Sequence, residues 1–547
     1  MSIAAEQLID AAVRQRLIEA DTLAHLRVEA RRKRVDLLDA VTAHYRLPVA
    51  ALYRAVAELR GLPFVDTTGL TPPPELLKKI PQALLRRKAI LPLSENSEGI
   101  LLAVADPDDR ATIDSIQRLL GRNIRLAVAD PNTLKAIINR ALASTSQGQA
   151  ASAVSQAAEV DLVALLNDIL KEAFLRRASD VHIVQEEFGL RVRLRVDGGL
   201  QDYNVNTDGN ETVVNGLISR IKVLSNLDIA EQREPQDGGM SYYLPAPIDS
   251  EFNIRVATAP TRLGERVTMR ILGQEAHNLT LEKLGMSAED LVMFRKAIRK
   301  PFGMILLTGP TGSGKSTTLF AALQEINAPD LNIMTVENPI EYVMEGVSQI
   351  QTGPKISFAG ALRSLLRHDP DVLMVGEIRD EETADVALKA AMTGHLVFST
   401  LHTNTAAGTV ARLIDIGCEP FLIGSTMNAV IAQRLVRRLC PHCRVEKAAT
   451  AEERDLLDVK TASATIYEPK GCAYCQGSGY RGRLGLFETL WFDEELSKLV
   501  ARGAAEEELE SRAGTRLRSM WNDGSAKVLA GATTLSELQT VAVKRER

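Results

Sequence analysis

No apolar run in this sequence approaches the roughly 18 consecutive residues that a membrane-spanning helix needs. The first segment, MSIAAEQLIDAAVRQRL, places acidic residues among its apolar positions and has no signal-peptide core. Both absences count against a membrane-spanning or exported chain. We therefore expect a cytoplasmic protein, which would reach a membrane only through a protein partner.

Aromatic residues are also scarce, and the chain has no excess of positive over negative charge. Aromatics make up 4% of the chain, and the formal net charge is −5. A general nucleic-acid binder normally carries a basic surface, and single-strand binders add aromatic stacking platforms. The composition therefore counts against direct nucleic-acid binding. A chain of 547 residues is too long for one core, so we expect about three or four domains.

Cysteine is rare, with five residues, of which four form two C-x-x-C pairs, CPHC and CAYC. Two such pairs supply the four thiolates of a typical structural zinc site. CPHC could alternatively be a thiol–disulfide exchange motif, but no thioredoxin-like strand–helix unit surrounds it. Unmetallated thiols remain a further alternative, and we do not expect His442 to substitute as a ligand. The sequence favours Zn²⁺ bound by Cys440, Cys443, Cys472 and Cys475.

The distribution of apolar residues divides the chain into segments. Helical spacing dominates the start, where RRKR (31–34) is either a docking patch or a solvated helix face. Two similar stretches, ILLAVADP and IRLAVADP, predict strands that lead into turns of one small domain. ASTSQGQAASAVSQAAE has too little apolar content to fold and predicts a flexible linker. The predicted parts are a helical docking region (1–60), a small α/β domain (61–142), the linker (143–159), a second α/β domain (160–275), and a final α/β domain with C-terminal helices (277–547) that includes the cysteine subdomain (about 436–490).

The strongest local signal is GMILLTGPTGSGKSTTLFAAL, in which a short apolar strand runs into a glycine-rich turn and a helix. This is the context that the phosphate-loop motif requires. Glycines let backbone N–H groups surround the phosphates of ATP at a helix N-terminus, whose dipole also favours anions. Lys315 adds positive charge, and the Ser316 hydroxyl is the expected ligand of Mg²⁺. The predicted nucleotide-binding residues are Gly309, Pro310, Thr311, Gly312, Ser313, Gly314, Lys315, Ser316 and Thr317.

Hydrolysis also needs a carboxylate that orients water and cationic groups that neutralise charge. LNIMTVENPIEY predicts a strand followed by Glu337 and Glu341, and DVLMVGEIRD predicts a strand followed by Glu377. Ligand groups gather at the carboxyl ends of parallel strands, where these acids fall. GHLVFSTLHTNTA predicts another strand, flanked by His395 and His402. Two histidines around one strand favour a γ-phosphate sensor over two hydrogen-bonded core residues.

In their order along the chain these motifs resemble the secretion ATPases of type II secretion and type IV pilus assembly. The resemblance is close from about 160 to 490 and looser over 60–142. Its motifs are SDVHI, DIAEQREPQDGG, GERVTMRIL, GPTGSGKST, ENPIEY, DPDVLMVGEIRDEETADVALKAAMTGHLVFSTLHTNTAAGTVARL and GYRGRLGLFE. The resemblance implies a RecA-like phosphate-loop ATPase core, preceded by a PAS-like α/β domain and carrying a zinc subdomain.

The resemblance also implies an activity and an assembly. Family members form homo-hexamers at an inner-membrane platform protein, so the chain would be cytoplasmic and peripheral at that membrane. We expect a hexamer that hydrolyses ATP to power pseudopilus assembly in type II secretion, with type IV pilus assembly as the alternative. The cysteine insertion is typical of assembly rather than retraction ATPases, and motifs such as DIAEQREPQDGG favour type II secretion.

Individual roles follow from the same resemblance. In this family a glycine stands where other ATPases have the strand-ending aspartate, so Glu377, beside Gly376, is the expected catalytic carboxylate. ENPIEY matches the family's acidic box, except that Asn338 replaces the usual aspartate. Asparagine keeps the shape but loses the charge, and we expect Glu337 and Glu341 to suffice.

The family's histidine box matches residues 395–404. Arginines of the preceding domain are expected to act on the terminal phosphate. Arg255 in NIRVATAPT and Arg270 in MRIL match these positions, and Arg266 is a weaker candidate. The alternative for these arginines is an ordinary surface ion pair.

Two other classes of function remain open. A nucleic-acid translocase could use the same ATPase core, and DNA-stimulated hydrolysis would support it. A nucleotide-responsive subunit without turnover would be compatible with Asn338. Some relatives bind a cyclic dinucleotide through an Arg-Leu-Gly-initiated motif, but RRKRVDLLDAV does not match it, and we do not expect that ligand.

Overall fold

The computed structural model describes residues 3–68, 70–145, 161–186, 189–205, 211–273, 280–353, 355–461 and 463–544. The chain forms two compact units, Met1–Gln274 with Gly471–Ser478, and Glu275–Lys470 with Gly479–Arg547. From position 146 onward, the predicted linker lies outside the described residues. In the described ranges, no helix combines the length and apolar character needed to cross a bilayer.

The second unit is built on an eight-stranded sheet. In spatial order its strands are β12 (Val347–Gln351), β11 (Ile333–Glu337), β13 (Val372–Val375), β14 (Leu396–Leu401), β10 (Gly303–Thr308), β15 (Met427–Leu439), β18 (Tyr480–Trp491) and β19 (Leu517–Arg518). The strands from β12 to β15 are parallel, and β18 and β19 run antiparallel to their neighbours. All the carboxyl ends of the parallel strands therefore lie along one edge.

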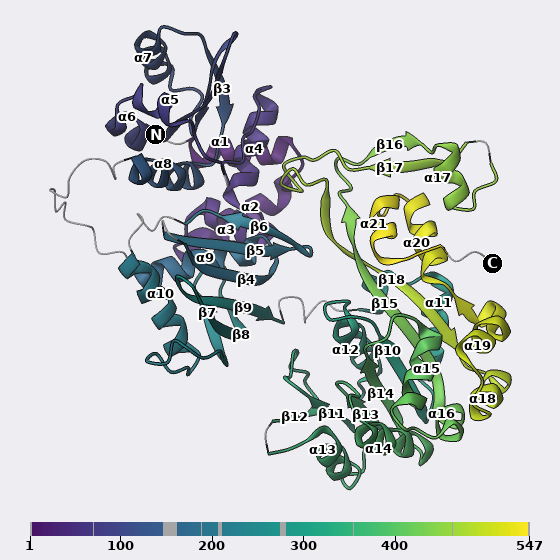
Figure 1. Ribbon diagram of the computed structural model, residues 1–547. Coiled ribbons are helices and arrows are strands. Elements are labelled where there is room, and N and C mark those ends of the chain that lie inside the picture. Colours follow the sequence, from purple (N-terminus) through teal and green to yellow (C-terminus); the bar gives the residue numbers. More distant parts are fainter. Residues whose placement is uncertain are drawn as a thin grey trace. The chain divides into compact units, whose positions relative to one another are not determined.

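Helices cover both faces of this sheet (Figure 1). Alternate residues of β10 point to opposite sides, so Ile305 packs with α11 and α12, and Leu306 packs with α13, α14 and α15. Burial on both faces explains why the central strands are continuous apolar runs such as VLMV. Outside the segment between the two cysteine pairs, the helices of this unit are α11 (Ala288–Ala297), α12 (Lys315–Ile326), α13 (Phe358–Leu365), α14 (Glu381–Met392), α15 (Ala406–Asp415), α16 (Pro420–Thr426), α18 (Glu494–Ala501), α19 (Glu506–Ala513), α20 (Met520–Leu529) and α21 (Leu535–Val541), with short 3₁₀ turns at Leu281–Leu284 and Gly514–Arg516.

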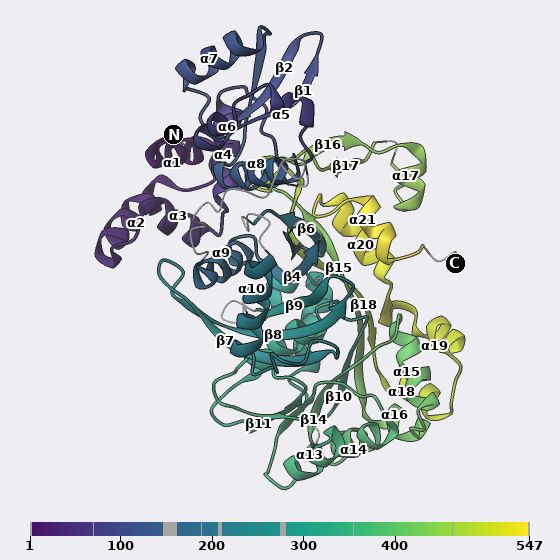
Figure 2. The ribbon, with the colours of Figure 1, turned by 60° about the vertical axis from the view of Figure 1, so that its left-hand side comes forward.

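The first unit contains a six-stranded antiparallel sheet. Its strands in spatial order are β6 (Gly199–Tyr203), β5 (Gly189–Val196), β4 (Ala178–Glu186), β9 (Gly264–Leu272), β8 (Ser250–Thr261) and β7 (Gln236–Leu244). Helices α9 (Leu162–Leu175) and α10 (Glu211–Leu224) lie beside this sheet (Figure 2). Apolar side chains of the sheet and of both helices belong to one core cluster. The chain turns after GLRVRLRV at Asp197 and Gly198, which both have positive φ angles, 49° and 89°.

The N-terminal part of the first unit consists of a helical group and a small three-stranded sheet. The helical group is α1 (Ala5–Arg14), α2 (Ala20–Lys33), α3 (Leu37–Tyr45) and α4 (Val49–Leu59). The following elements are α5 (Pro74–Lys78), α6 (Gln82–Lys88), β1 (Ile90–Asn96), β2 (Gly99–Val104), α7 (Arg110–Leu120), β3 (Ile124–Val128) and α8 (Pro131–Thr145). The two similar stretches of the sequence form β2 and β3, which pair in parallel, and each precedes a helix. The predicted multidomain α/β fold is thus confirmed.

Candidate functional site

The phosphate loop follows β10 at the carboxyl edge of the eight-stranded sheet, and its path depends on glycine. Gly309, Gly312 and Gly314 have φ angles of 146°, 78° and 87°, which L-residues rarely adopt. A Cβ atom on Gly309 would lie 2.5 Å from the carbonyl oxygen of Gln433, and one on Gly314 would lie 2.8 Å from Gln433 Nε2. The loop therefore lies directly against β15, with no room for a side chain at either position.

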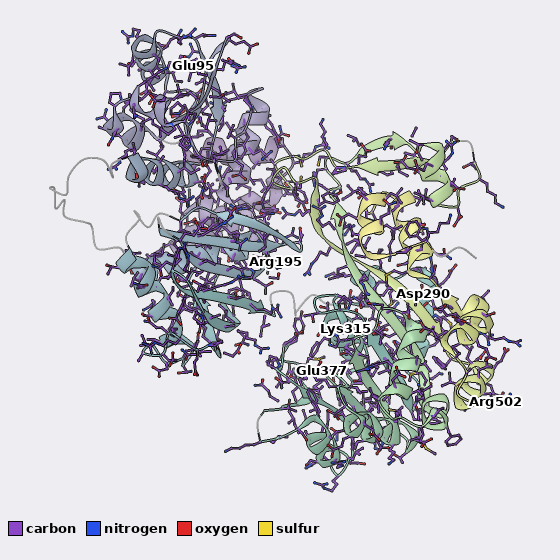
Figure 3. The ribbon with its side chains drawn as sticks, in the orientation of Figure 1. Glu95, Arg195, Asp290, Lys315, Glu377 and Arg502 are labelled. Atoms are coloured by element: carbon purple, nitrogen blue, oxygen red, sulfur yellow. The ribbon has the colours of Figure 1, made fainter. Side chains whose placement is uncertain are left out.

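Lys315, the first residue of α12, turns its ammonium group back toward this loop. It donates hydrogen bonds to the carbonyl oxygens of Gly309 at 2.6 Å and of Pro310 at 3.2 Å. Burial lowers the pKa of Lys315 to about 8, while the negative charges of Glu377 and Glu341 act to raise it. Two of the predicted acids therefore lie within electrostatic reach of the loop lysine, and Figure 3 shows Lys315 and Glu377 close together in the second unit.

Glu337 ends β11 and is buried, with 3% of its surface exposed. Its Oε1 accepts hydrogen bonds from Thr335 Oγ1 at 2.6 Å and from Gln349 Nε2 at 3.0 Å. Burial raises the pKa of the Glu337 carboxyl. A hydrogen bond from the backbone N–H of Glu341 to this carboxyl acts to lower the pKa. The acidic box is therefore a folded-back turn that brings Glu337 and Glu341 together at the end of β11.

Glu377 lies immediately after Gly376, where β13 has ended. One carboxylate oxygen pairs with Arg379, and the other lies 3.4 Å from His402 Nε2. The Thr400 hydroxyl donates to the Gly376 carbonyl at 2.7 Å, and the N–H of Ile378 donates to the Thr400 carbonyl at 3.0 Å. Bonds to β14 therefore fix the backbone on both sides of Glu377.

The two histidines lie at opposite ends of β14. Leu401 pairs with Thr308 beside the phosphate loop, whereas Leu396 pairs with Gly303 at the other edge of the sheet. A strand of this length spans about 20 Å. His402 therefore lies at the phosphate-loop edge, and His395 lies at the opposite edge, where its Nδ1 is 2.9 Å from the carbonyl oxygen of Ala390. Residues that bracket a strand lie at its two ends, so His402 is the one of this pair at the phosphate-loop edge, and the interpretation of His395 as a γ-phosphate sensor stays a prediction.

Sequence reasoning missed the polar residues that β15 brings to the loop. Gln433 Oε1 accepts a hydrogen bond from Thr318 Oγ1 of α12 at 2.8 Å. The next residue, Arg434, has Nη1 only 3.0 Å from the position that a Cβ on Gly309 would take, and its Nη2 donates to Asn404 Oδ1 at 3.0 Å. The only signal was a Gln-Arg pair inside the apolar run NAVIAQRLV, which acquires meaning once β15 is known to lie beside β10.

The predicted arginines belong to the first unit. Arg255 of β8 is the register partner of Arg270 of β9, so both project from the same face of the six-stranded sheet. Arg270 Nε donates to Asp180 Oδ1 at 2.9 Å, and Arg195 Nε lies 3.8 Å from Asp180 Oδ2. Arg266 lies four residues before Arg270, near the start of β9. Arg270 is thus held by an acid, whereas the exposed Arg255 projects beside it.

Four cysteines converge where β15 ends and β18 begins. Their Sγ atoms lie within 4.8 Å of one another, and those of Cys472 and Cys475 are 3.8 Å apart. A tetrahedral site with Zn–S bonds of about 2.3 Å has S–S edges of about 3.8 Å, so this donor set fits Zn²⁺. The Cys472 N–H donates to Cys475 Sγ at 3.1 Å, which favours a thiolate. His442 lies outside this cluster of described residues.

The chain between the two cysteine pairs forms a small hairpin. Its elements are β16 (Val445–Ala448), α17 (Ala451–Leu456) and β17 (Thr465–Glu468), and β16 pairs antiparallel with β17. The N–H of Cys440 donates to the Gly479 carbonyl at 2.9 Å, so the first pair is also bound to a residue four positions after the second pair. The cysteines thus close the base of the hairpin.

Comparison with known proteins gives two family matches. The family model described as "Type II/IV secretion system protein" matches residues 155–540, and the MshEN domain matches residues 60–148. The first match contains every residue of the phosphate loop, the three acids and the cysteine cluster. The second contains the small three-stranded sheet.

Several characterised proteins are similar along most of their length. The chain is 41% identical over 508 residues to the type II secretion system protein E of Pseudomonas aeruginosa, covering 88% of this chain and 98% of the relative. It is 36% identical over 554 residues to the type IV pilus assembly ATPase PilB of Myxococcus xanthus, covering 96% of this chain and 97% of the relative. It is 47% identical over 386 residues to the type II secretion system ATPase E of Vibrio cholerae, covering 70% and 76%.

Solved structures support the fold. The Legionella pneumophila ATPase DotB matches with a TM-score of 0.53 at 22% identity, covering 71% of this chain and 97% of that chain. The Yersinia pseudotuberculosis DotB matches with a TM-score of 0.52 at 19% identity, covering 72% and 97%. At these identities the likeness concerns the architecture alone.

Proposed function

The chain belongs to the type II/IV secretion system protein family, and on this basis we propose that it is an ATPase that powers pseudopilus assembly in type II secretion. It hydrolyses ATP to ADP and phosphate. The observation that carries this proposal is the arrangement of Lys315, Glu377 and His402 at one edge of the sheet, with Glu377 in contact with His402 at 3.4 Å. That edge combines an anion-binding loop with a positioned carboxylate, the two requirements of phosphoryl transfer to water.

Each residue at this edge has a proposed task. The amides of residues 309–314 and the Lys315 ammonium bind the phosphates. Glu377 orients the attacking water and accepts its proton, because the backbone bonds to β14 hold its carboxylate at the loop edge. His402 contacts the terminal phosphate. Ser316 would hold Mg²⁺, which neutralises phosphate charge when bound.

The acidic box supports the same reaction without an aspartate at 338. Glu337 and Glu341 retain two carboxylates at the end of β11, and Glu341 is close enough to act on the pKa of Lys315. We infer that they suffice for turnover. If the protein is wholly inactive and Asn338→Asp makes it active, Glu337 and Glu341 do not suffice for turnover. That result would indicate that the chain is a regulatory subunit.

The test of the ATPase proposal is Glu377→Gln, which keeps the shape of the side chain and removes its charge. We expect the turnover number to fall at least about 100-fold while nucleotide affinity changes less than about threefold. Glu382→Gln is the matched control, because Glu382 pairs with Arg363 on an exposed helix surface. Hydrolysis that survives in Glu377→Gln would contradict the assignment.

The assembly and location proposed here follow from the family. The chain acts as a homo-hexamer in the cytoplasm and reaches the inner membrane through a platform protein, without binding nucleic acid. The sizes of complexes formed with and without ATP test the hexamer. Hydrolysis that DNA stimulates would favour the translocase alternative instead.

Type IV pilus assembly is the second candidate, because the M. xanthus pilus ATPase matches over 96% of this chain. The higher identities, 41% and 47%, are to type II secretion proteins. Deletion of the gene in its source bacterium distinguishes the two. Loss of exported enzymes supports type II secretion, and loss of surface pili with normal export supports pilus assembly.

The cysteine cluster is proposed to bind one Zn²⁺ per chain in a structural role. The fitting S–S distance and the N–H···S bond support this. Elemental analysis of the purified protein tests it directly. A protein that folds and hydrolyses ATP with no bound metal would show that the thiols are unmetallated.

A further inference from the structure

The segment that carries the second cysteine pair belongs to the first compact unit. Gly471–Ser478 groups with Met1–Gln274, although its flanking residues belong to the second unit. Ala473, which lies between the two cysteines of this pair, is 1% exposed and is part of the same core cluster as Leu8 of α1 and Leu52 of α4. Tyr474 packs against that cluster and is partly buried. We call residues 471–478 the second knuckle.

Helix α4 needs partners on more than one side. Its sequence, VAALYRAVAEL, is apolar around almost the whole circumference, and six of its residues are buried. A helix that is hydrophobic all round is stable only when it is enclosed. Helix α1 and strand β3 contact α4, and Ala50, Ala51 and Arg54 line a cavity of about 400 Å³ together with residues 476–478 of the second knuckle. The knuckle therefore faces the side of α4 that carries these three residues.

The closest approach is between Arg54 and Gly477. The Arg54 guanidinium lies over the Phe64 ring at 4.6 Å and against the Gly477 backbone, where an added Cβ would meet its nitrogens at 2.7 Å and 2.8 Å. Gly477 also has a φ angle of 84°, which favours glycine. The knuckle thus leaves room for a planar cation at the one position where α4 presents an arginine.

The same turn holds the sulfur atoms and the packing residues. The N–H groups of Gln476, Gly477 and Ser478 donate to the carbonyls of Ala473, Cys472 and Cys475 at 3.2, 2.9 and 3.1 Å. These bonds are made within a segment of eight residues that has no helix or strand. A bound metal would stabilise the conformation of such a segment, because binding free energy at a structural zinc site is folding free energy.

We propose that the second knuckle is the docking element of the N-terminal helical group of this same chain, and that metal at the four cysteines holds it in the docking conformation. Ala473 completes the core between α1 and α4, and the Gly477 backbone receives Arg54. The inference rests on the proposed zinc site, but the docking contact and the metal are separable by experiment.

The test is hydrogen exchange on the full-length protein, with zinc content measured on the same samples. On removal of zinc with a chelator, amides of α1 (Ala5–Arg14) and α4 (Val49–Leu59) should exchange at least about tenfold faster. Amides of β4, which belongs to a different core cluster of the first unit, and of α12 should keep their rates.

A variant separates docking from metal binding. Ala473→Glu places a charge at the buried position and leaves all four cysteines in place, so zinc should remain at one per chain while α1 and α4 exchange faster. Ala448→Glu is the matched control, because Ala448 is exposed on β16 of the same hairpin. If Ala473→Glu does not give folded protein, Tyr474→Ala replaces it.

Each experimental outcome tests one part of the proposal. Unchanged exchange of α1 and α4 in the zinc-retaining variants overturns the docking. Faster exchange in Ala473→Glu but not after zinc removal overturns the metal dependence. Purified protein without zinc refutes the zinc site alone, and the variant arm still tests the docking contact.

Discussion

Asp130, the residue that precedes α8, is a buried acid that forms no ion pair within the described part of the chain. It is 7% exposed, and its Oδ2 accepts a hydrogen bond from the Thr133 N–H at 3.2 Å. Its Oδ1 is among the buried polar atoms of the described chain that have no hydrogen-bond partner. Burial raises the pKa of Asp130 to about 6, and the negative charge of Glu172 adds to the rise. The charged form is therefore disfavoured in the folded first unit.

This predicts a pH-dependent stability that Asp130→Asn removes. The folded-state pKa lies above the unfolded value of 3.8, so Asp130 destabilises the fold progressively as the pH rises from about 4 through about 6. At pH 8 the asparagine variant should be more stable by on the order of 1–3 kcal/mol, and at pH 4 the two proteins should match. Thermal unfolding of the first unit at both pH values measures this. An equal stability difference at both pH values would contradict it.

The lowered pKa of Lys315 predicts that nucleotide binding depends on pH. With a pKa of about 8, the lysine loses its charge as the pH rises above that value, and a neutral amine binds phosphate poorly. The dissociation constant for ATP should rise up to about tenfold between pH 8 and pH 9. Titration with a fluorescent nucleotide measures it. A dissociation constant that stays level from pH 7 to pH 9.5 would show that Lys315 remains charged.

At the scale of elements, the end of β13 is crowded. A Cβ atom on Gly376 would lie 3.3 Å from the Val336 carbonyl oxygen and 3.5 Å from Glu337 Cα of the neighbouring strand. Ordinary phosphate-loop ATPases accommodate an aspartate at this point, but here the adjacent strand already supplies the buried Glu337. The glycine therefore avoids a second carboxylate beside the buried Glu337.

Substituting this glycine tests the point. Gly376→Asp should lower the turnover number at least about tenfold, because its carboxylate is placed beside Glu337, whose pKa is already raised by burial. Gly376→Ala, which adds only the Cβ, should keep most of the activity. If the two variants lose activity equally, the loss results from the space that the added Cβ occupies and not from the added charge.

The strands and the phosphate loop were predictable because their signals are local. GSGK fixes a turn by its glycines, and the apolar run before it can only be a buried strand. The placement of His395 was not predictable without strand direction, since only the parallel pairing of β14 with β10 shows which end of β14 meets the loop. Gln433 and Arg434 were missed for a related reason, because strand order brings β15 beside β10 across more than a hundred residues.

At the scale of the whole molecule, the proposed catalytic residues are divided between the two compact units. The phosphate loop and the acids belong to the second, and Arg255 and Arg270 belong to the first. If Arg255 neutralises charge on the terminal phosphate, Arg255→Ala should lower the turnover number at least about tenfold without unfolding the sheet. Arg191→Ala is the matched control, because Arg191 pairs with Asp202 on the same sheet. Near-normal turnover in Arg255→Ala would remove it from the site.

The second knuckle also bears on the order in which the chain can fold. Ala473 and Leu52 share one core although about 420 positions separate them in the sequence. At synthesis rates of about 5–20 residues per second, the ribosome needs roughly 20–80 s to travel that distance. Throughout this interval α1 and α4 exist without the residue that completes their core. The first part of the protein to be made is therefore among the last to be finished, and its apolar surface stays open to chaperones and neighbouring nascent chains until the second knuckle emerges.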